Sequence, residues 1–336
     1  MNVYWNHITD EKYREEIEFL LHKQLEGDRQ TSKLHGKKIG FLLNIAGPPS
    51  DKHLLHLETL LQALTHYFPT SNHFVLADNF YPSCDSLLKR YIPDTRYMQH
   101  EHFSTIPKKR PTLQFTFFGA PKGSSCLSGR YMPNSISEAD YLISITFLEE
   151  DPIFSLHGST ASNFWFLPTY TKNEILVQEN LQGRSLSLIE AISPFISNIH
   201  CFIHLFSSPA ESFMVLSQNT VSADAVSGKL CNIPSSKNKL IGLADKKGFG
   251  TSVLSHMTIY GKRIKKPVVF FDNEGEHFTL GIRKDQCNLC ENCVVFCPLH
   301  ALYIQNQHLF WDSEKCNRCG YCISICPQSA LFKRRK

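Results

Sequence analysis

Eight of the 12 cysteines stand in two short runs near the end of the 336-residue chain. The first run holds Cys287, Cys290, Cys293 and Cys297, and the second, beginning 29 positions later, holds Cys316, Cys319, Cys322 and Cys326. Both runs follow the pattern C-x2-C-x2-C-x3-C, and a proline follows the last cysteine of each. This spacing is typical of [4Fe–4S] ligation, in which a tight loop supplies three thiolates and the next cysteine points away along a short helix.

Two copies of the run can complete two clusters by exchanging their last cysteines. We expect one cluster on Cys287, Cys290, Cys293 and Cys326, and the other on Cys316, Cys319, Cys322 and Cys297. Such clusters transfer single electrons. The alternatives are two zinc sites, which favour separated cysteine pairs, and clusters with a purely structural role. The double pattern resembles the bacterial-type two-cluster ferredoxin over about residues 276–332.

The residues between the cysteines predict the small structure that holds them. Residues 301–311 read as a hairpin with its tip at 305–307, and residues 278–282 can pair with residues 330–332. The repeat predicts a pseudo-twofold domain with a cluster near each end. The basic tail, Lys333 to Lys336, is expected to be a frayed, solubilising end.

The long front part alternates strand and helix patterns. A helix is predicted over 10–25, a buried strand over 37–44, a second helix from Ser50 or Asp51, and a strand over 73–78. The second helix carries an apolar stripe of Leu54, Leu57, Leu61, Leu64 and Phe68. Further strands are expected over 113–119, 139–147 and 199–206, and further helices over 174–182, 185–195 and 221–230.

This alternation predicts an α/β fold, an open and mostly parallel sheet covered by helices, followed by a small α+β ferredoxin-like two-cluster domain. We place the boundary near Lys266–Pro267, which gives an α/β domain over 1–265 and a two-[4Fe–4S] domain with the basic tail over 266–336. Ligands of open α/β sheets bind at the carboxyl ends of the strands.

That rule nominates Asn44, Asp78, His157, Asn163 and the loop Gly119–Cys126 as candidate site residues, catalytic or ligand-binding. If a site exists, the four side chains should converge; the alternative is that they are scattered turn formers and helix caps. Other residues with possible chemistry are expected to be structural. These are a solvated helix face with His53 and His56, a half-buried strand face with His200 and His204, and core cysteines at 84, 126, 201 and 231.

The front part also resembles the DUF362 family, a domain often joined to a C-terminal two-cluster ferredoxin. The likeness covers about residues 15–262, and its best pieces are Asp78, Glu138–Asp140, Asp224, Gly248, Gly250 and Gly261. Family members carry Lys-Pro-Asn where this chain has Leu42, Leu43 and Asn44. They also carry a Lys-x-His segment and a later Lys-Asn pair, whereas residues 147–164 keep His157 and Asn163 without a lysine. Family members usually have an aspartate at the start of the segment that contains Asp224, and this chain has Asn219 there. If the family's lysines bind an anion, this chain has either lost that anion-binding site or binds a different ligand there.

Composition and charge limit the classes of function that the sequence supports. The formal charge of +4 equals that of the basic tail, so no global basic field points to nucleic acid. The chain shows no apolar run of membrane-spanning length and no secretory pattern at its start, which predicts a cytoplasmic protein.

The leading hypothesis is an iron–sulfur oxidoreductase that passes low-potential electrons through two [4Fe–4S] clusters to a small-molecule ligand or protein held by the α/β domain, with a redox protein as partner. Whether it is an enzyme stays open. The alternatives are a non-enzymatic electron carrier or adaptor on a larger redox complex, and a redox or iron sensor. No flavin fingerprint is present, and a flavin between the clusters and the substrate stays open.

Overall fold

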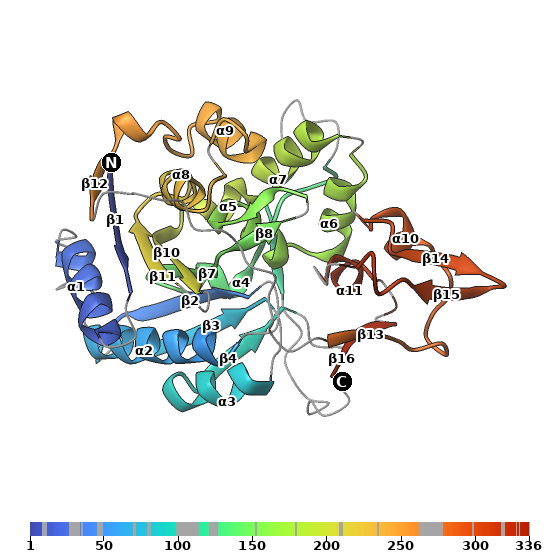
Figure 1. Ribbon diagram of the computed structural model, residues 1–336, viewed down its shortest axis with the longest axis horizontal. Coiled ribbons are helices and arrows are strands. Elements are labelled where there is room, and N and C mark those ends of the chain that lie inside the picture. Colours follow the sequence, from blue (N-terminus) through green and yellow to red (C-terminus); the bar gives the residue numbers. More distant parts are fainter. Residues whose placement is uncertain are drawn as a thin grey trace.

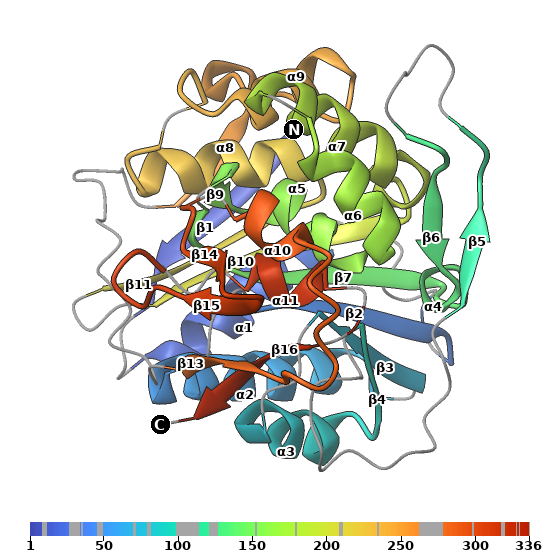
Figure 2. The ribbon, with the colours of Figure 1, turned by 90° about the vertical axis from the view of Figure 1, so that its right-hand side faces the viewer.

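The computed structural model describes a large α/β body with a small C-terminal domain packed on one side of it (Figures 1 and 2). The described residues are 1–8, 12–26, 34, 36–45, 50–69, 72–78, 82–98, 114–120, 127–151, 153–178, 180–207, 211–233, 235–261, 278–297, 299–316, 320–326, 328 and 330–335. Within them, no helix combines the length and the apolar character needed to cross a membrane.

An eight-stranded sheet forms the centre of the large body. Its order is β12 (Thr258–Tyr260), β1 (Asn2–His7), β11 (Ser212–Ser217), β10 (Ile199–Ser207), β7 (Tyr141–Phe147), β2 (Lys38–Asn44), β3 (Asn72–Ala77) and β4 (Asp94–Tyr97). The neighbours from β10 to β4 are parallel, while β11 is antiparallel to both β10 and β1. The expected mostly parallel sheet is therefore confirmed.

Helices cover both faces of the sheet. Successive strand residues point to opposite sides, so apolar strands give the sheet two apolar faces that must both be buried. Phe41 and Leu43 of β2 face the core shared with α1 (Tyr13–Glu26), α2 (Asp51–Tyr67) and α3 (Pro82–Tyr91), whereas Leu42 faces the second core. The second core packs against α5 (Ser159–Ser162), the 3-10 helix η2 (Asn163–Phe166), α6 (Thr169–Leu176), α7 (Leu181–Ile196), α8 (Thr220–Leu230) and α9 (Lys239–Lys246). A further 3-10 helix, η3 (Leu254–His256), precedes β12.

Two small antiparallel ribbons lie outside the main sheet. One pairs β5 (Phe115–Phe117) with β6 (Tyr131–Pro133), which leads into α4 (Asn134–Ser137). The other pairs β8 (Glu149–Asp151) with β9 (Ser155–His157) directly after β7. The strand expected over 113–119 thus exists as β5, but it does not join the central sheet.

The small domain has the expected internal repeat. Its pairs are β13 (Phe278–Ile282) with β16 (Leu331–Arg335), and β14 (Leu302–Gln305) with β15 (His308–Trp311), and its short helices are α10 (Asn292–Val295) and α11 (Tyr321–Ser324). The hairpin turn falls at Asn306 and Gln307, both with positive φ. Arg335 pairs with Phe278, so the expectation of a frayed tail is wrong up to that residue. The proposed domain boundary lies outside the described residues.

Several elements depart from the sequence expectations. Strands β1 and β11 were not predicted, because six residues of mixed polarity give too short a pattern to separate from a turn. The single helix expected over 174–182 is divided: α6 ends at Leu176, and the Asn180 side chain accepts a hydrogen bond from the Gly183 amide and begins α7.

Candidate functional site

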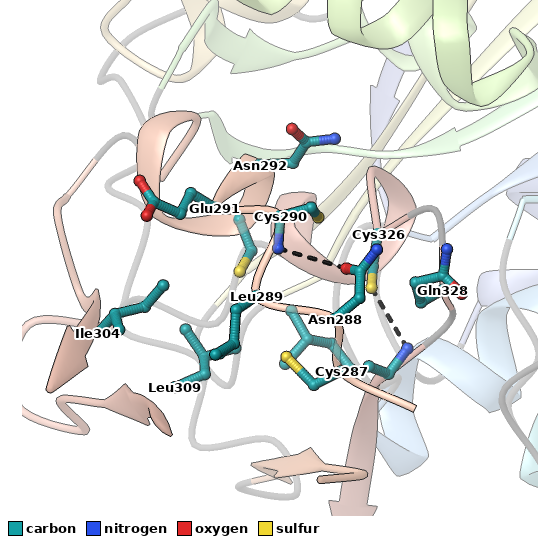
Figure 3. A pocket seen from close by; sticks show the side chains of 13 residues that line it. Cys287, Asn288, Leu289, Cys290, Glu291, Asn292, Ile304, Leu309, Cys326 and Gln328 are labelled. Atoms are coloured by element: carbon teal, nitrogen blue, oxygen red, sulfur yellow. Dashed lines mark hydrogen bonds between the residues drawn. The ribbon is translucent and has the colours of Figure 1, made fainter. Parts of the chain in front are cut away.

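Four cysteine thiols surround one cavity in the small domain. Cys287, Cys290 and Cys293 come from the first run, and Cys326 comes from the end of the second (Figure 3). The remaining lining is mostly apolar and includes Leu289, Ile304 and Leu309. These four cysteines are the set expected from the crossed arrangement.

The donor chemistry of this cavity fits a [4Fe–4S] cluster. Burial, reinforced by the neighbouring Cys326, Cys290 and Cys287, raises the pKa of the Cys293 thiol to about 12. Four thiolates at this proximity repel one another unless a cationic centre binds them, and a bound metal deprotonates its thiols. The Ala330 amide donates a hydrogen bond to Cys326 Sγ at 3.2 Å, the kind of contact that tunes cluster potentials.

The second half repeats these features 29 positions apart. The Ala301 amide donates to Cys297 Sγ at 3.2 Å, as Ala330 does to Cys326. Cys297, Cys316 and Cys322 are each half-buried, while Cys319 lies outside the described residues. The assignment of Cys316, Cys319, Cys322 and Cys297 to a second cluster therefore stays a prediction.

In the large body, the four nominated residues are all buried. Asn44 at the end of β2, Asp78 after β3, His157 and Asn163 are all at most 1% exposed. Asn44 Nδ2 donates to the Ser162 carbonyl at 2.9 Å, next to Asn163, and the Ile45 amide donates to Asp78 Oδ1 at 3.2 Å. Parallel strands with right-handed crossovers bring these ends to one edge.

His157 is positioned by the β8–β9 ribbon. Its Nδ1 atom lies 3.6 Å from Asp151 Oδ2, and Asp151 Oδ1 accepts hydrogen bonds from the Ile153 and Phe154 amides at 2.8 and 2.7 Å. Burial opposes protonation of His157, but Asp151, with Glu149 and Asp78, outweighs burial and raises the pKa of the imidazole.

Asp224 holds the segment that follows His157. Its carboxylate accepts from the Ser159 amide at 2.7 Å and from the Thr160 amide at 3.0 Å, which satisfies the first amides of α5. Burial raises the pKa of Asp224 to about 6. His204 also contacts Ser159, and its Nδ1 lies 2.8 Å from Ser227 Oγ. Burial lowers the pKa of His204 to about 3, so it stays neutral.

Sequence reasoning missed Lys172 on α6. This lysine is 3% exposed, and its ammonium lies 5.8 Å and 5.7 Å from the ring centres of Phe164 and Trp165. Burial lowers the pKa of Lys172 to about 7, against the opposing charge of Asp78. The signal was present: Lys172 and Asn173 form a Lys-Asn pair beyond the Glu-Ala-Asp segment, nine positions after Asn163. The stretch noted above for its lack of a lysine, residues 147–164, ends before this pair.

The small domain reaches this interior through Tyr321 on α11. The Tyr321 hydroxyl donates to Asp151 Oδ2 at 3.1 Å, the same oxygen that faces His157. The ring packs 5.2 Å from Phe164 and 5.0 Å from Trp165, centre to centre, and Tyr321 is 2% exposed. Tyr321 precedes Cys322 in the chain, so the second cysteine run contacts the polar interior of the large body.

Other nominated residues are placed elsewhere or differently. Residues 121–126 of the Gly119–Cys126 loop, with Cys126, lie outside the described residues. His53 and His56 are buried, so the solvated face expected for them is wrong; His53 completes the capping box of α2 with Ser50, and burial lowers the pKa of its imidazole to about 4.

The remaining predictions are mixed. His204 is fully buried rather than half-buried, whereas His200 is half-buried as expected. The expected core cysteines Cys84, Cys201 and Cys231 are buried. Glu138 and Asp140 bind Lys38 at the opposite, amino end of the strands, so their role in the fold is structural.

Comparison with known proteins supports the assignment of iron–sulfur ligation to the small domain. Residues 279–327 match the family model of a 4Fe–4S dicluster domain. No curated protein matches the chain. Matching solved structures include the lactate racemase apoprotein from Thermoanaerobacterium thermosaccharolyticum, with 14% identity and a TM-score of 0.39 over 64% of this chain and 54% of that one. The chain thus spans about half the length of that structure. The four-thiol cavity, the repeated amide–sulfur contacts and the family match together identify a ferredoxin-type 4Fe–4S dicluster domain at residues 279–327.

Proposed function

We propose that the protein is an iron–sulfur oxidoreductase in which the buried polar group around His157 receives electrons by way of the dicluster domain. The observation that carries this proposal is the contact of Tyr321 with Asp151, whose carboxylate also faces His157. It places a residue between two cysteines of the second run against the polar interior of the large body.

The residues of the large body are suited to handle a small molecule and its protons. When bound, the two [4Fe–4S] clusters supply single electrons, and a two-electron reduction of a small molecule also consumes protons. Asp151 orients His157 and favours its protonated form, so Nε2 can deliver a proton in a water-excluded place. Asn44 and Asn163 are held by backbone carbonyls and can orient a ligand.

The resemblance to the DUF362 family supports the same proposal. Of the pieces that carry it, Asp78 lies in the polar group and Asp224 holds the segment next to His157. Lys172 and Asn173 supply a Lys-Asn pair of the kind that family members carry. We therefore propose this family for the front part, with an α/β domain over about 1–265.

Reoxidation of the reduced protein tests the proposal. The anaerobic chain is reduced with titanium(III) citrate, freed of excess reductant and mixed with a panel of small carbonyl and carboxylate compounds, while its visible absorbance is followed. With an acceptor that reoxidises the wild type, His157→Gln should slow the reaction about 100-fold or more, as expected for the loss of a general acid. Tyr321→Phe should slow it without loss of iron, and Tyr303→Phe, altered on an exposed ring, should not.

Equal reoxidation of wild type and His157→Gln by every active acceptor would remove the large body from the redox reaction. That result would favour the second candidate, an electron carrier or adaptor without a substrate. Its support is a set of exposed apolar side chains on the dicluster domain, Val295, Leu299, Tyr303 and Phe310, which a protein partner could cover. In that case reduction by a soluble protein donor should depend on this set and not on His157.

A further inference from the structure

Among the described residues, three of the nominated side chains have a buried polar atom without a hydrogen-bond partner. These atoms are Asn44 Oδ1, Asn163 Oδ1 and His157 Nε2. The amide orientations are set by the backbone, because Asn44 Nδ2 donates to the Ser162 carbonyl and Asn163 Nδ2 donates to the Ser159 carbonyl at 2.7 Å. Both unpartnered amide atoms are therefore acceptors. Buried polar atoms are rarely left unpaired, so atoms of this kind on neighbouring segments point to a ligand.

Lys172 adds a cationic donor to this set. Its ammonium contacts the faces of Phe164 and Trp165, and among the described residues no carboxylate lies within ion-pair distance of it. A buried ammonium needs an anion or several acceptors, and two ring faces supply only part of that.

The charges that act on Lys172 and His157 come from several elements. Asp78 follows β3 and acts on both, while Asp151 and Glu149 on β8 act on His157. Asp224 on α8 already accepts two amides of α5. Lys172 and His157 thus share Asp78 as an acidic neighbour, and Asp78 Oδ1 already accepts a hydrogen bond from the Ile45 amide.

We propose that this interior binds a small carboxylate that bears an N–H or O–H donor beside the carboxylate group. Lys172 and His157 Nε2 contact the carboxylate, and the carbonyl oxygens of Asn44 and Asn163 accept from the donor group. The inference rests on the proposed function, since it names the class of molecule that would be reduced there. A metal cation is disfavoured by the two basic groups, and a phosphate dianion by Asp78 and the two amide oxygens.

Oxamate is a suitable probe, because it joins a carboxylate to an amide whose two N–H bonds match two acceptors. Its binding to the oxidised, cluster-containing chain is measured by titration calorimetry. Oxamide, which has the same size without the charge, and inorganic phosphate are the comparison ligands. Oxamate should bind at least tenfold more tightly than either. Its affinity should fall as the pH rises through 7, since burial lowers the pKa of Lys172 to about 7 and binding requires the ammonium form.

Variants separate the site from the fold. Lys172→Met should weaken oxamate at least tenfold and reduce the pH dependence to the part that His157 contributes, whereas Lys229→Met, on an exposed turn of α8, should leave both unchanged. Unchanged visible spectra and circular dichroism show that each variant is folded and carries its clusters. Equal affinity for oxamide, tighter binding of phosphate, or an unaffected Lys172→Met variant overturns the proposal. The titration transfers no electrons, so a failure here with reoxidation still dependent on His157 rejects the carboxylate class and leaves the proposed function standing.

Discussion

Lys172 is the residue whose cost to stability is easiest to measure. An ordinary lysine has a pKa of about 10.4, and burial lowers that of Lys172 to about 7. Between these values the unfolded chain binds a proton that the folded chain does not, so stability rises with pH over that window. The penalty below pH 7 is on the order of 4 kcal/mol.

Lys172→Met keeps the apolar stem and removes the charge. We therefore expect it to raise the free energy of unfolding at pH 6 by up to about 4 kcal/mol and to show little gain near pH 10. Anaerobic urea denaturation at both pH values measures this. Lys229→Met, exposed on α8, is the control and should give less than about 0.5 kcal/mol at either pH. A destabilised Lys172→Met at pH 6 would mean that an unrecognised anion compensates the lysine in the free protein.

The crossed ligands give a second prediction for single residues. Cys326 lines the cavity of Cys287, Cys290 and Cys293 although it stands 33 positions beyond Cys293. Cys326→Ser should disrupt the cluster of the first run and lower the iron content from about eight to about four per chain. Iron analysis and paramagnetic resonance of the reduced variant measure it. Loss of the signal that Cys316→Ser also removes, with the other signal retained, would contradict the crossing.

At the scale of elements, the junction between β9 and α5 is the most tightly constrained. A methyl group added at Gly158 would collide with the carboxylate of Asp224, which holds the Ser159 and Thr160 amides. Gly158→Ala should destabilise the protein by about 2 kcal/mol or more, because the carboxylate must leave buried donors unpaired. Gly242→Ala on α9 is the matched control.

A methyl group at Gly242 meets nothing within 4 Å, so this change should stabilise the protein by about 0.5–1 kcal/mol through helix propensity. Denaturant midpoints of both variants provide the comparison. Loss of stability at Gly242 of the same size as at Gly158 would show that alanine is poorly tolerated for a reason other than the Asp224 contact.

The spacing of apolar residues explains which helices and strands could be predicted from the sequence. The leucine stripe of α2 and the apolar runs of β2, β3 and β7 follow from burial with regular spacing, and each was predicted within a few residues. The β8–β9 ribbon gives no such pattern in three-residue strands, so Asp151 was not recognised. Lys172 was hidden for a different reason: a lysine on a short helix is ordinarily exposed, and only tertiary packing buries this one.

For the whole molecule, α11 joins the two bodies. Tyr321 and Ile325 belong to the same apolar core as Phe164 and Trp165. Tyr321→Ala should therefore lower the free energy of unfolding by about 3–5 kcal/mol, as large aromatic truncations in a core do. Tyr303→Ala, altered on a ring that is 43% exposed, should cost less than about 1 kcal/mol.

Limited proteolysis of the same two variants reports on the junction itself. In Tyr321→Ala, cleavage within the dicluster domain should accelerate, because fewer contacts hold this domain to the large body. Equal cleavage of Tyr321→Ala and Tyr303→Ala would mean that contacts other than the Tyr321 ring dominate the junction. The order of the two bodies along the chain followed from the cysteine pattern, but their contact did not, since no local signal marks Tyr321 as an interface residue.

The 29-residue repeat has one further consequence. Tyr321 of α11, which is 2% exposed, corresponds to Asn292 of α10, which is half-buried. Ile325 of the second copy is fully buried, whereas its counterpart Phe296 is half-buried against the same core, so the large body covers the second copy more completely than the first. Because solvent exposure influences the reduction potential of an iron–sulfur centre, we expect two clusters bound by these halves to have unequal potentials. Electrons should therefore pass between the two clusters in one preferred direction, from the cluster of lower potential to the cluster of higher potential.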